Sequence, residues 1–187
     1  ASIHELYMAR GKESIKQPFT VPAMNLRVLS FESAKAVFRA AQKIHAGAMI
    51  FEIARSEMNY TDQRPAEYTT SILAAAVQEG YTGPVFIQGD HFQVSMKKYS
   101  ADPTAEIDAL KALIREAVAG GFFNIDVDTS TMVDLSKTTI AEQQELNTEL
   151  SAMLTAYIRE VEPKGVAISV GGEIGEVGGH NSTEDEL

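Results

Sequence analysis

A short apolar run in the middle of the chain ends on two adjacent residues that can do chemistry. In the stretch PVFIQGDHFQV, residues 84–94, Asp90 and His91 follow closely on the apolar run. A carboxylate can act as a general acid or base, and an imidazole can do the same or bind a metal ion. The pair is therefore either part of a solvated loop or the edge of an active site. Because side chains alternate along a strand, we expect Asp90 and His91 to leave it in different directions, so that one holds a metal ion while the other reaches a substrate proton.

The other apolar segments of the chain also end in polar, mostly ionisable side chains. In chain order these ends carry Asn25 and Arg27; Glu52, Arg55 and Ser56; Gln88, Asp90 and His91; Asp126, Asp128 and Ser130; and Glu173 and Glu176. The beginnings of the same segments are apolar or contain Gly and Pro. Solvated loops would place polar residues at both ends, whereas functional groups in parallel β/α folds gather at the C-terminal ends of the strands. We interpret this pattern as a functional rim.

The residue types on this rim favour a metal ion. The chain has no cysteine, which excludes thiol nucleophiles and iron–sulfur clusters and leaves histidine, carboxylates and carbonyls as ligands. Asp126 and Asp128 are expected on one face of their strand, where they would repel each other unless a cation or hydrogen-bond donors neutralise them. The alternative is that Asp128 caps the following turn. Together with Asp90, Asp128 and Glu173, His91 predicts a site for Zn²⁺ or a harder divalent ion.

Strand-like and helix-like segments alternate from residue 19 onward. We expect strands at 19–27, 48–54, 83–91, 122–130 and 165–175, and helices at 31–45, 65–80, 103–121 and 139–162. The helix at 103–121 has clear causes. Asp102 can cap it, Pro103 suits its first position, apolar residues recur at three- and four-residue spacing, and Gly120 and Gly121 end it.

Strict alternation of this kind predicts a parallel sheet with right-handed crossovers. Two architectures fit: an open doubly wound sheet and a TIM (β/α)₈ barrel. No G-x-G-x-x-G follows the first strand, which argues against a dinucleotide-binding open sheet. Five units would complete an open sheet but make only part of a barrel. We expect an α/β barrel in which residues 1–18 form a helical lead-in and residues 19–187 supply roughly the first five β/α units. Ser182 or Thr183, followed by acidic residues, predicts a helix start, so we expect the chain to be a piece of a longer protein.

The bulk properties limit the partners. The chain has 187 residues, a net charge of −10 and a pI near 4.8, which argues against binding to nucleic acid or to an anionic membrane. It contains no apolar run long enough for a membrane span and no apolar signal core at its N-terminus. We expect a cytoplasmic protein that acts on a small molecule.

Three motifs in order along the chain resemble a known family. GDHFQV, VDLS and GGEIGEVGG, together with VPAMNLR on the first strand, resemble the class II, zinc-dependent ketose-bisphosphate aldolases, which include fructose-1,6-bisphosphate and tagatose-bisphosphate aldolases. The resemblance runs from about residue 19 to 180. It implies a (β/α)₈ barrel, commonly dimeric, that reversibly cleaves a ketose bisphosphate into dihydroxyacetone phosphate and an aldehyde. A class I aldolase would need a Schiff-base lysine at a strand end, and no expected strand end supplies one.

The resemblance also assigns roles. It implies that His91 is the first of three histidine ligands of a catalytic Zn²⁺, that Asp90 is the general acid/base, and that Asn25 contacts the substrate. Glu173 and a fourth-strand carboxylate match positions that serve a second cation or an alternate zinc position. That carboxylate is Asp128 by strand length or Asp134 by the local match to VDLS.

The sequence also departs from the family's pattern. Gln88 stands where many relatives have a histidine, and EIARSE replaces a serine-containing phosphate contact, for which Arg55, with Ser56 beside it, is a plausible anion-binding substitute. His180 is interpreted as loop. The remaining zinc histidines and phosphate loops are expected beyond residue 187.

Two other functions stay open. One is a metal-assisted β/α-barrel lyase acting on a substrate that is not a bisphosphate. The other is a non-catalytic sugar-phosphate-binding relative. The sequence does not distinguish fructose from tagatose stereochemistry.

Overall fold

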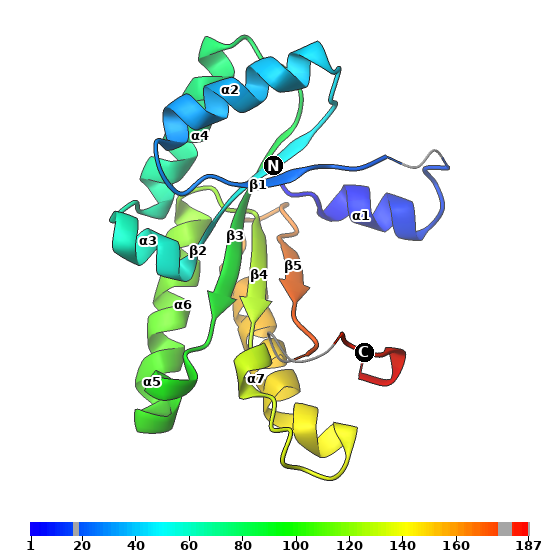
Figure 1. The fold of residues 1–187 in the computed structure, drawn as a ribbon, viewed down its shortest axis with the longest axis vertical. Helices are drawn as coiled ribbons and strands as arrows, with labels where there is room; N and C mark the ends of the chain where they lie inside the picture. Colours follow the sequence, from blue (N-terminus) through cyan, green and yellow to red (C-terminus); the bar gives the residue numbers. More distant parts are fainter. Residues whose placement is uncertain (17–18, 176–180, 187) are drawn as a thin grey trace.

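The computed structural model describes residues 1–16, 19–175 and 181–186. Five parallel strands form one sheet in the order β1-β2-β3-β4-β5 (Figure 1). The strands are β1 (Ala23–Asn25), β2 (Met49–Ala54), β3 (Val85–Gln93), β4 (Asn124–Asp128) and β5 (Ser169–Gly172). The helices are α1 (His4–Gly11), α2 (Ser30–Lys43), α3 (Arg55–Thr61), α4 (Pro65–Gln78), α5 (Met96–Ala101), α6 (Pro103–Ala119) and α7 (Ile140–Val161), with 3₁₀ turns η1 (Ser130–Met132) and η2 (Glu184–Glu186).

The strand order decides between the two expected architectures. In a doubly wound sheet the order reverses at a switch point, whereas here each strand pairs with its neighbour in the sequence. This is the order of a (β/α)₈ barrel, and the expectation of a partial barrel is confirmed. Strands β1 and β5 form the two edges, so the sheet is not closed within the described residues.

The two faces of the sheet are covered differently. Helices α2, α4, α6 and α7 pack over one face, where Phe51, Ile53, Ile87 and Phe92 belong to the main core. On the other face a small cluster of Ile3, Ile50 and Phe86 lies near the beginnings of the strands. Figure 1 shows α1 on the side of the sheet opposite to α4 and α6.

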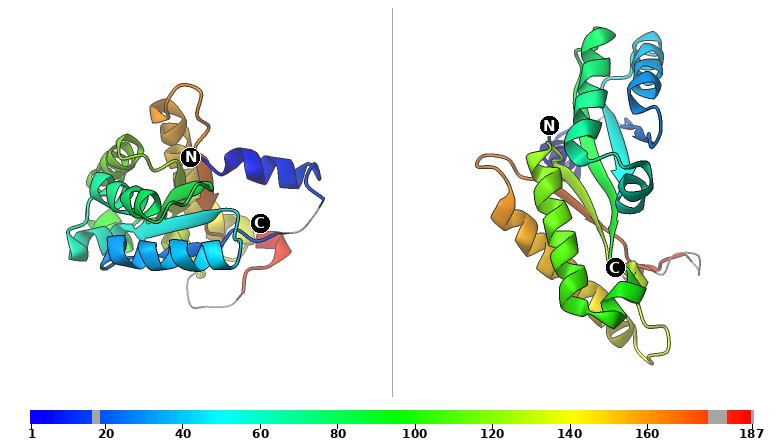
Figure 2. Two further views of the ribbon diagram at one scale, coloured as in Figure 1. Left: turned by 90° about the horizontal axis from the view of Figure 1, so that it is seen from above. Right: turned by 90° about the vertical axis from the view of Figure 1, so that its left-hand side faces the viewer.

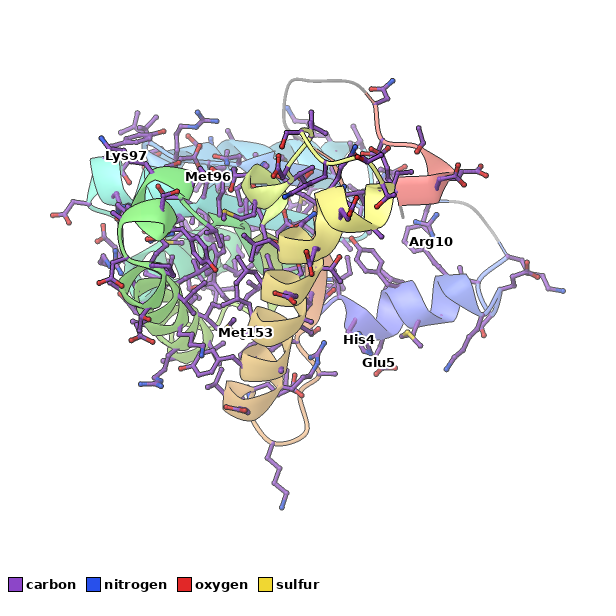
Figure 3. All side chains as sticks on the ribbon, turned by 90° about the horizontal axis from the view of Figure 1, so that it is seen from below. His4, Glu5, Arg10, Met96, Lys97 and Met153 are labelled. Carbon is purple, nitrogen blue, oxygen red and sulfur yellow. The ribbon has the colours of Figure 1, made fainter. Side chains whose placement is uncertain are left out.

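The first residues of the chain are tied to the base of the sheet by Asn124 at the start of β4. Its side-chain oxygen accepts from the backbone N–H of Ile3 at 2.8 Å, and its amide donates to the carbonyl oxygens of Ala1 and Ile87. In Figure 3, seen from below Figure 1, His4 on α1 and Met96 on α5 lie on different sides of the molecule. The first three residues thus pack against the sheet, where Ile3 contacts Ile50 and Phe86.

Most element boundaries follow the sequence. Asp102 Oδ1 accepts from the N–H of Ala105 at 3.0 Å at the start of α6, and Gly121 takes a left-handed φ of 90° beyond its end, as predicted. Strands β1 and β5 are shorter than expected and are limited to Ala23–Asn25 and Ser169–Gly172. The short helices α3 and α5 were not predicted, because one or two turns carry too little periodicity to recognise.

The carboxyl ends of the strands all lie at one end of the sheet. Helix α3 follows β2, α5 follows β3, and η1 follows β4 at this end. Figure 2 shows the same ribbon in two further views. No helix in the described part of the chain is long and apolar enough to cross a membrane.

Candidate metal centre and adjoining cavity

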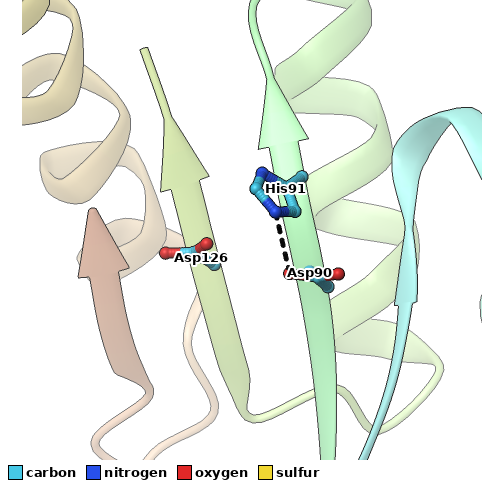
Figure 4. Close-up of side chains that lie close together, drawn as sticks. All are labelled: Asp90, His91 and Asp126. Carbon is cyan, nitrogen blue, oxygen red and sulfur yellow. Dashed lines mark ion pairs between the residues drawn. The ribbon is translucent and has the colours of Figure 1, made fainter. Parts of the chain in front are cut away.

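A bulge at the end of β3 brings Asp90 and His91 to the same side of the sheet. The pairing of β3 with β4 shifts register between Gly89 and Phe92, and His91 has a φ of 43°. Positive φ is rare for a non-glycine residue, and bulges next to active sites re-aim side chains. His91 Nε2 lies 3.6 Å from Asp90 Oδ1 (Figure 4). The expectation that the two side chains diverge is wrong, because regular alternation stops at the bulge.

Asp126 from β4 completes a three-residue cluster. Asp90, His91 and Asp126 each offer one ligand atom, and these atoms all lie within 4.8 Å of one another. Gly171 on β5 leaves room for Asp126, since a Cβ there would come within 2.7 Å of its Oδ1. Burial and the charge of Glu173 raise the pKa of Asp126 to about 6. A divalent cation would relieve this crowding of negative charge.

Asp128 orients the imidazole of His91. Its Oδ2 lies 3.1 Å from His91 Nδ1 and accepts from Gln93 Nε2 at 2.6 Å, while its Oδ1 accepts from the backbone and hydroxyl of Ser130. Burial alone would raise the pKa of Asp128, but the hydrogen bonds from Ser130, His91 and Gln93 outweigh it and lower the pKa. An Nδ1–H held by a carboxylate leaves Nε2 free to bind a metal. Asp128 thus stands behind His91, with both its oxygens already hydrogen-bonded.

The same carboxylates act on the protonation of His91. Burial lowers its pKa, but the hydrogen bond to Asp128 and the charges of Asp90, Asp128 and Asp126 outweigh burial and raise it. A metal ion must displace the proton from Nε2, so metal binding at this site weakens as the pH falls.

A further carboxylate, Glu52 on β2, lies near the cluster, and its nearest partner is Gln88 on β3. Gln88 Nε2 donates to Glu52 Oε2 at 2.9 Å, from the position next to Glu52 across the β2–β3 pair. Burial, followed by the charges of Asp90 and Asp126, raises the pKa of Glu52 to about 7.

The raised pKa of Glu52 predicts a loss of stability with rising pH. The folded protein holds this proton up to about pH 7, whereas the unfolded chain releases it near 4.5. The stabilisation is therefore complete below pH 4.5 and is lost as the pH rises through 7. Discounted for partial exposure, it amounts to about 1–2 kcal/mol. Urea unfolding in the presence of a chelator at pH 5 and pH 8 should show this loss in the parent protein and a smaller one in Glu52→Gln.

Exposed Glu67 on α4 offers the matched control for this measurement. Glu67→Gln should keep the pH dependence of the parent. An equal pH dependence in Glu52→Gln and the parent would contradict the assignment to Glu52.

A cavity of about 630 Å³ opens beside the cluster, and the three substrate-contact candidates Asn25, Arg55 and Ser56 all line it. Asp90 and His91 lie on its wall. The cavity thus brings together predicted site residues from the ends of three strands, β1, β2 and β3. Its further lining residues include Arg27, Glu57, Asn59, Ser95, Lys98 and Thr131.

Arg55 is already paired within the protein. Its guanidinium makes two hydrogen bonds to the Glu106 carboxylate, at 2.5 and 3.2 Å, and one to the carbonyl oxygen of Gln93 at 2.7 Å. Glu106 on α6 is buried and also accepts from the backbone N–H of Ser95. Burial alone would raise the pKa of Glu106, but the hydrogen bonds from Arg55 and Ser95 lower it. Arg55 therefore fixes the loop after β3, and among the cavity's cations exposed Lys98 is the more available to an anion.

Of the remaining predicted metal ligands, Glu173 lies near the Asp90–His91–Asp126 cluster and Asp134 does not. Glu173 follows β5, and its charge acts on Asp126. The carbonyl oxygens of Glu173 and Ile174 accept from Asn147 of α7. Asp134 lies apart, exposed in a turn where it accepts from Ser136. Of the two fourth-strand candidates, Asp128 lies beside the cluster, against His91 Nδ1, while the strand-end carboxylate grouped with Asp90 and His91 is Asp126.

Two expectations fall on residues that the structure does not describe. Glu176 and His180 lie outside the described residues.

Two residues of the site were missing from the predicted set. Asp126 was recognised as a strand-end carboxylate but was not selected, although its spacing from Asp128 was a usable signal. Glu57 was not recognised, because it lies on the unpredicted helix α3 and only the tertiary structure buries it.

The fold and the site together define an α/β protein of barrel topology with a carboxylate–histidine cluster at the strand ends. The chain matches the family model of class-II fructose-bisphosphate aldolase over residues 11–187. It belongs to the class-II fructose-bisphosphate aldolase family, as the motifs suggested.

Other comparisons support the fold. No curated protein sequence matches the chain. Among solved structures, it is similar to a probable tagatose 6 phosphate kinase from Sinorhizobium meliloti 1021, with 16% sequence identity and a TM-score of 0.52. The similarity covers 75% of this chain and 37% of that protein, so the chain spans well under half of its length. At this identity the likeness concerns the fold alone.

Proposed function

We propose that the protein is a metal-dependent aldolase that reversibly cleaves a ketose bisphosphate into dihydroxyacetone phosphate and an aldehyde. The observation that carries the proposal is the Asp90–His91–Asp126 cluster at the strand ends, beside a polar cavity, in a chain of the class-II aldolase family. The family supports aldolase chemistry in general. The bisphosphate substrate and the metal are parts of our proposal.

The donor set fits Zn²⁺. One imidazole and carboxylate oxygens within 4.8 Å of one another suit this ion, and no cysteine competes for the role. We assign His91 Nε2 as a ligand, with Asp126 and Glu173 available to the same or a second cation. When bound, the cation acts as a Lewis acid toward the ketone oxygen of the substrate.

Asp90 is the proposed general acid/base. Its side chain is 18% exposed, and its Oδ2 accepts from Asn25 Nδ2 at 3.2 Å. It thus reaches the cavity while one hydrogen bond fixes its direction. In the cleavage direction it would take the proton of the C4 hydroxyl, and in the synthetic direction it would return a proton to the aldehyde oxygen.

Substrate contacts are proposed among the residues that line the cavity. Ser56 offers a hydroxyl to the sugar, and exposed Lys98 supplies positive charge for a phosphate. We keep Asn25 and Arg55 as proposed contacts that reach the substrate from their pairs with Asp90 and Glu106. By resemblance to the family, we further propose a homodimer that works in the cytoplasm, without nucleic-acid or membrane partners.

The pairing of Arg55 with Glu106 favours one alternative, a lyase acting on a substrate with fewer phosphates. The guanidinium of Arg55, the expected anion contact on this side, is already paired with the Glu106 carboxylate. Comparing a ketose bisphosphate with the corresponding monophosphate in one assay separates the two functions.

The test uses the full-length protein. We expect zinc to copurify with it, cleavage of fructose or tagatose bisphosphate in an assay coupled to reduction of dihydroxyacetone phosphate, and loss of that cleavage after chelation. Activity should return on adding Zn²⁺. Cleavage that persists without metal would reject the proposal, and zinc binding without cleavage of either sugar would favour the non-catalytic relative.

A further inference from the structure

Glu57 is a buried carboxylate next to the cluster that the proposed chemistry leaves unused. It lies in the first turn of α3, and its side chain is 8% exposed. Its Oε2 accepts from Asn25 Nδ2 and from the backbone N–H of Ala54, both at 2.8 Å, and its Oε1 lies 3.0 Å from Arg27 Nε. A buried carboxylate persists only where donors or charges compensate it, and here all three come from the ends of β1 and β2.

The amide of Asn25 lies between two carboxylates. Its nitrogen donates to Glu57 Oε2 at 2.8 Å and to Asp90 Oδ2 at 3.2 Å. Its oxygen is buried and has no hydrogen-bond partner among the described residues. Leaving an acceptor unpaired costs free energy, so this orientation is set by the two carboxylates. The flipped amide would point its oxygen at both of them.

Without the acceptor at position 57, only Asp90 would hold the amide. The 3.2 Å bond to Asp90 is the longer of the two, and the buried oxygen would gain by rotating toward a donor such as the N–H of Ala54. Rotation would remove the donor from Asp90, the residue whose direction matters most.

We propose that Glu57 is a positioning residue that acts through Asn25 on Asp90. It holds the Asn25 amide with its N–H groups toward Asp90, and so fixes the carboxylate that moves the proton. The inference deepens the proposed aldolase function and rests on it for its kinetic readout.

Two substitutions separate the acceptor from the charge. Both donors, Asn25 and the N–H of Ala54, reach the same oxygen of Glu57, so Glu57→Gln can keep both bonds with its single carbonyl oxygen. Glu57→Met fills a similar volume and replaces the carboxylate oxygens with a thioether, which is only a weak acceptor. In the full-length, zinc-loaded enzyme we expect kcat to stay within about threefold of the parent in Glu57→Gln and to fall about tenfold or more in Glu57→Met, with a smaller change in KM.

A double-mutant cycle distinguishes positioning from a structural role at the start of α3. In an Asn25→Ala background the route to Asp90 is gone, so Glu57→Met should lower kcat little further. Equal fold-losses in the two backgrounds would overturn the proposal, as would equal effects of Glu57→Gln and Glu57→Met.

A second readout does not depend on activity. The side-chain amide protons of Asn25, observed by ¹⁵N NMR in the full-length protein, should exchange slowly in the parent and in Glu57→Gln and quickly in Glu57→Met. If the parent cleaves no sugar, the proposed function fails while this measurement still tests the positioning. Unchanged exchange in Glu57→Met would reject it.

Discussion

Asp90→Asn should lower kcat for aldol cleavage by about 10²- to 10⁴-fold while zinc stays bound, which is the usual contribution of a positioned general acid or base. Asparagine has the shape of aspartate and keeps an oxygen for the bond from Asn25, but it cannot take up the proton. Steady-state kinetics and zinc analysis of the full-length protein measure both quantities. KM should change much less than kcat, because the cavity wall keeps its shape.

Asp108 provides the matched control, since it is an exposed aspartate on α6 outside the cavity. Asp108→Asn should behave like the parent. If Asp90→Asn loses zinc together with activity, Asp90 is a metal ligand instead. This outcome must be tested because Asp90 Oδ1 lies only 3.6 Å from His91 Nε2, the proposed ligand atom. Undiminished turnover would remove Asp90 from the mechanism.

His91→Ala should abolish both zinc binding and cleavage. The imidazole is the one neutral nitrogen donor of the Asp90–His91–Asp126 cluster, and without it only carboxylate oxygens would remain to hold the ion. Zinc titration with a competing chelator, followed by the cleavage assay, gives the affinity and the activity of the same sample. Zinc affinity close to that of the parent would place the metal elsewhere.

Asp128→Asn tests the orientation of His91 without removing the ligand. An asparagine amide can donate to Nδ1, which moves the imidazole proton to Nε2 and blocks metal binding there. Zinc affinity should therefore fall about 10- to 100-fold, less than in His91→Ala. His4→Gln on α1, away from the site, is the control and should leave zinc affinity unchanged.

The sequence was most informative where one element carries its own signal. Helix α6 could be predicted with both its ends because Asp102, Pro103 and the two glycines act within a few residues of the helix. The strand ends could be recognised because a change from apolar to ionisable side chains is local. Such signals depend on neighbours in the chain and not on the fold.

The candidate site was predicted only in part for the opposite reason. Asp90, His91 and Asn25 were found at strand ends, but their mutual geometry depends on residues from other elements. Glu57 is 32 residues from its partner Asn25, and no local pattern marks it as buried. Arg55 is paired with Glu106, which lies 51 residues away, so no pattern in the neighbouring sequence reveals that its charge is compensated.

By itself, the sequence determined the alternation of strands and helices, the polar strand ends and the absence of thiol chemistry, because composition and periodicity are properties of the chain. The tertiary structure alone decided which side chains meet. The bulge at His91 turned it toward Asp90 and Asp126, and the pairing of β3 with β4 set Asp128 behind the imidazole. Register and bulges arise from contacts between strands, so the direction of a side chain at a strand end cannot be read from one strand.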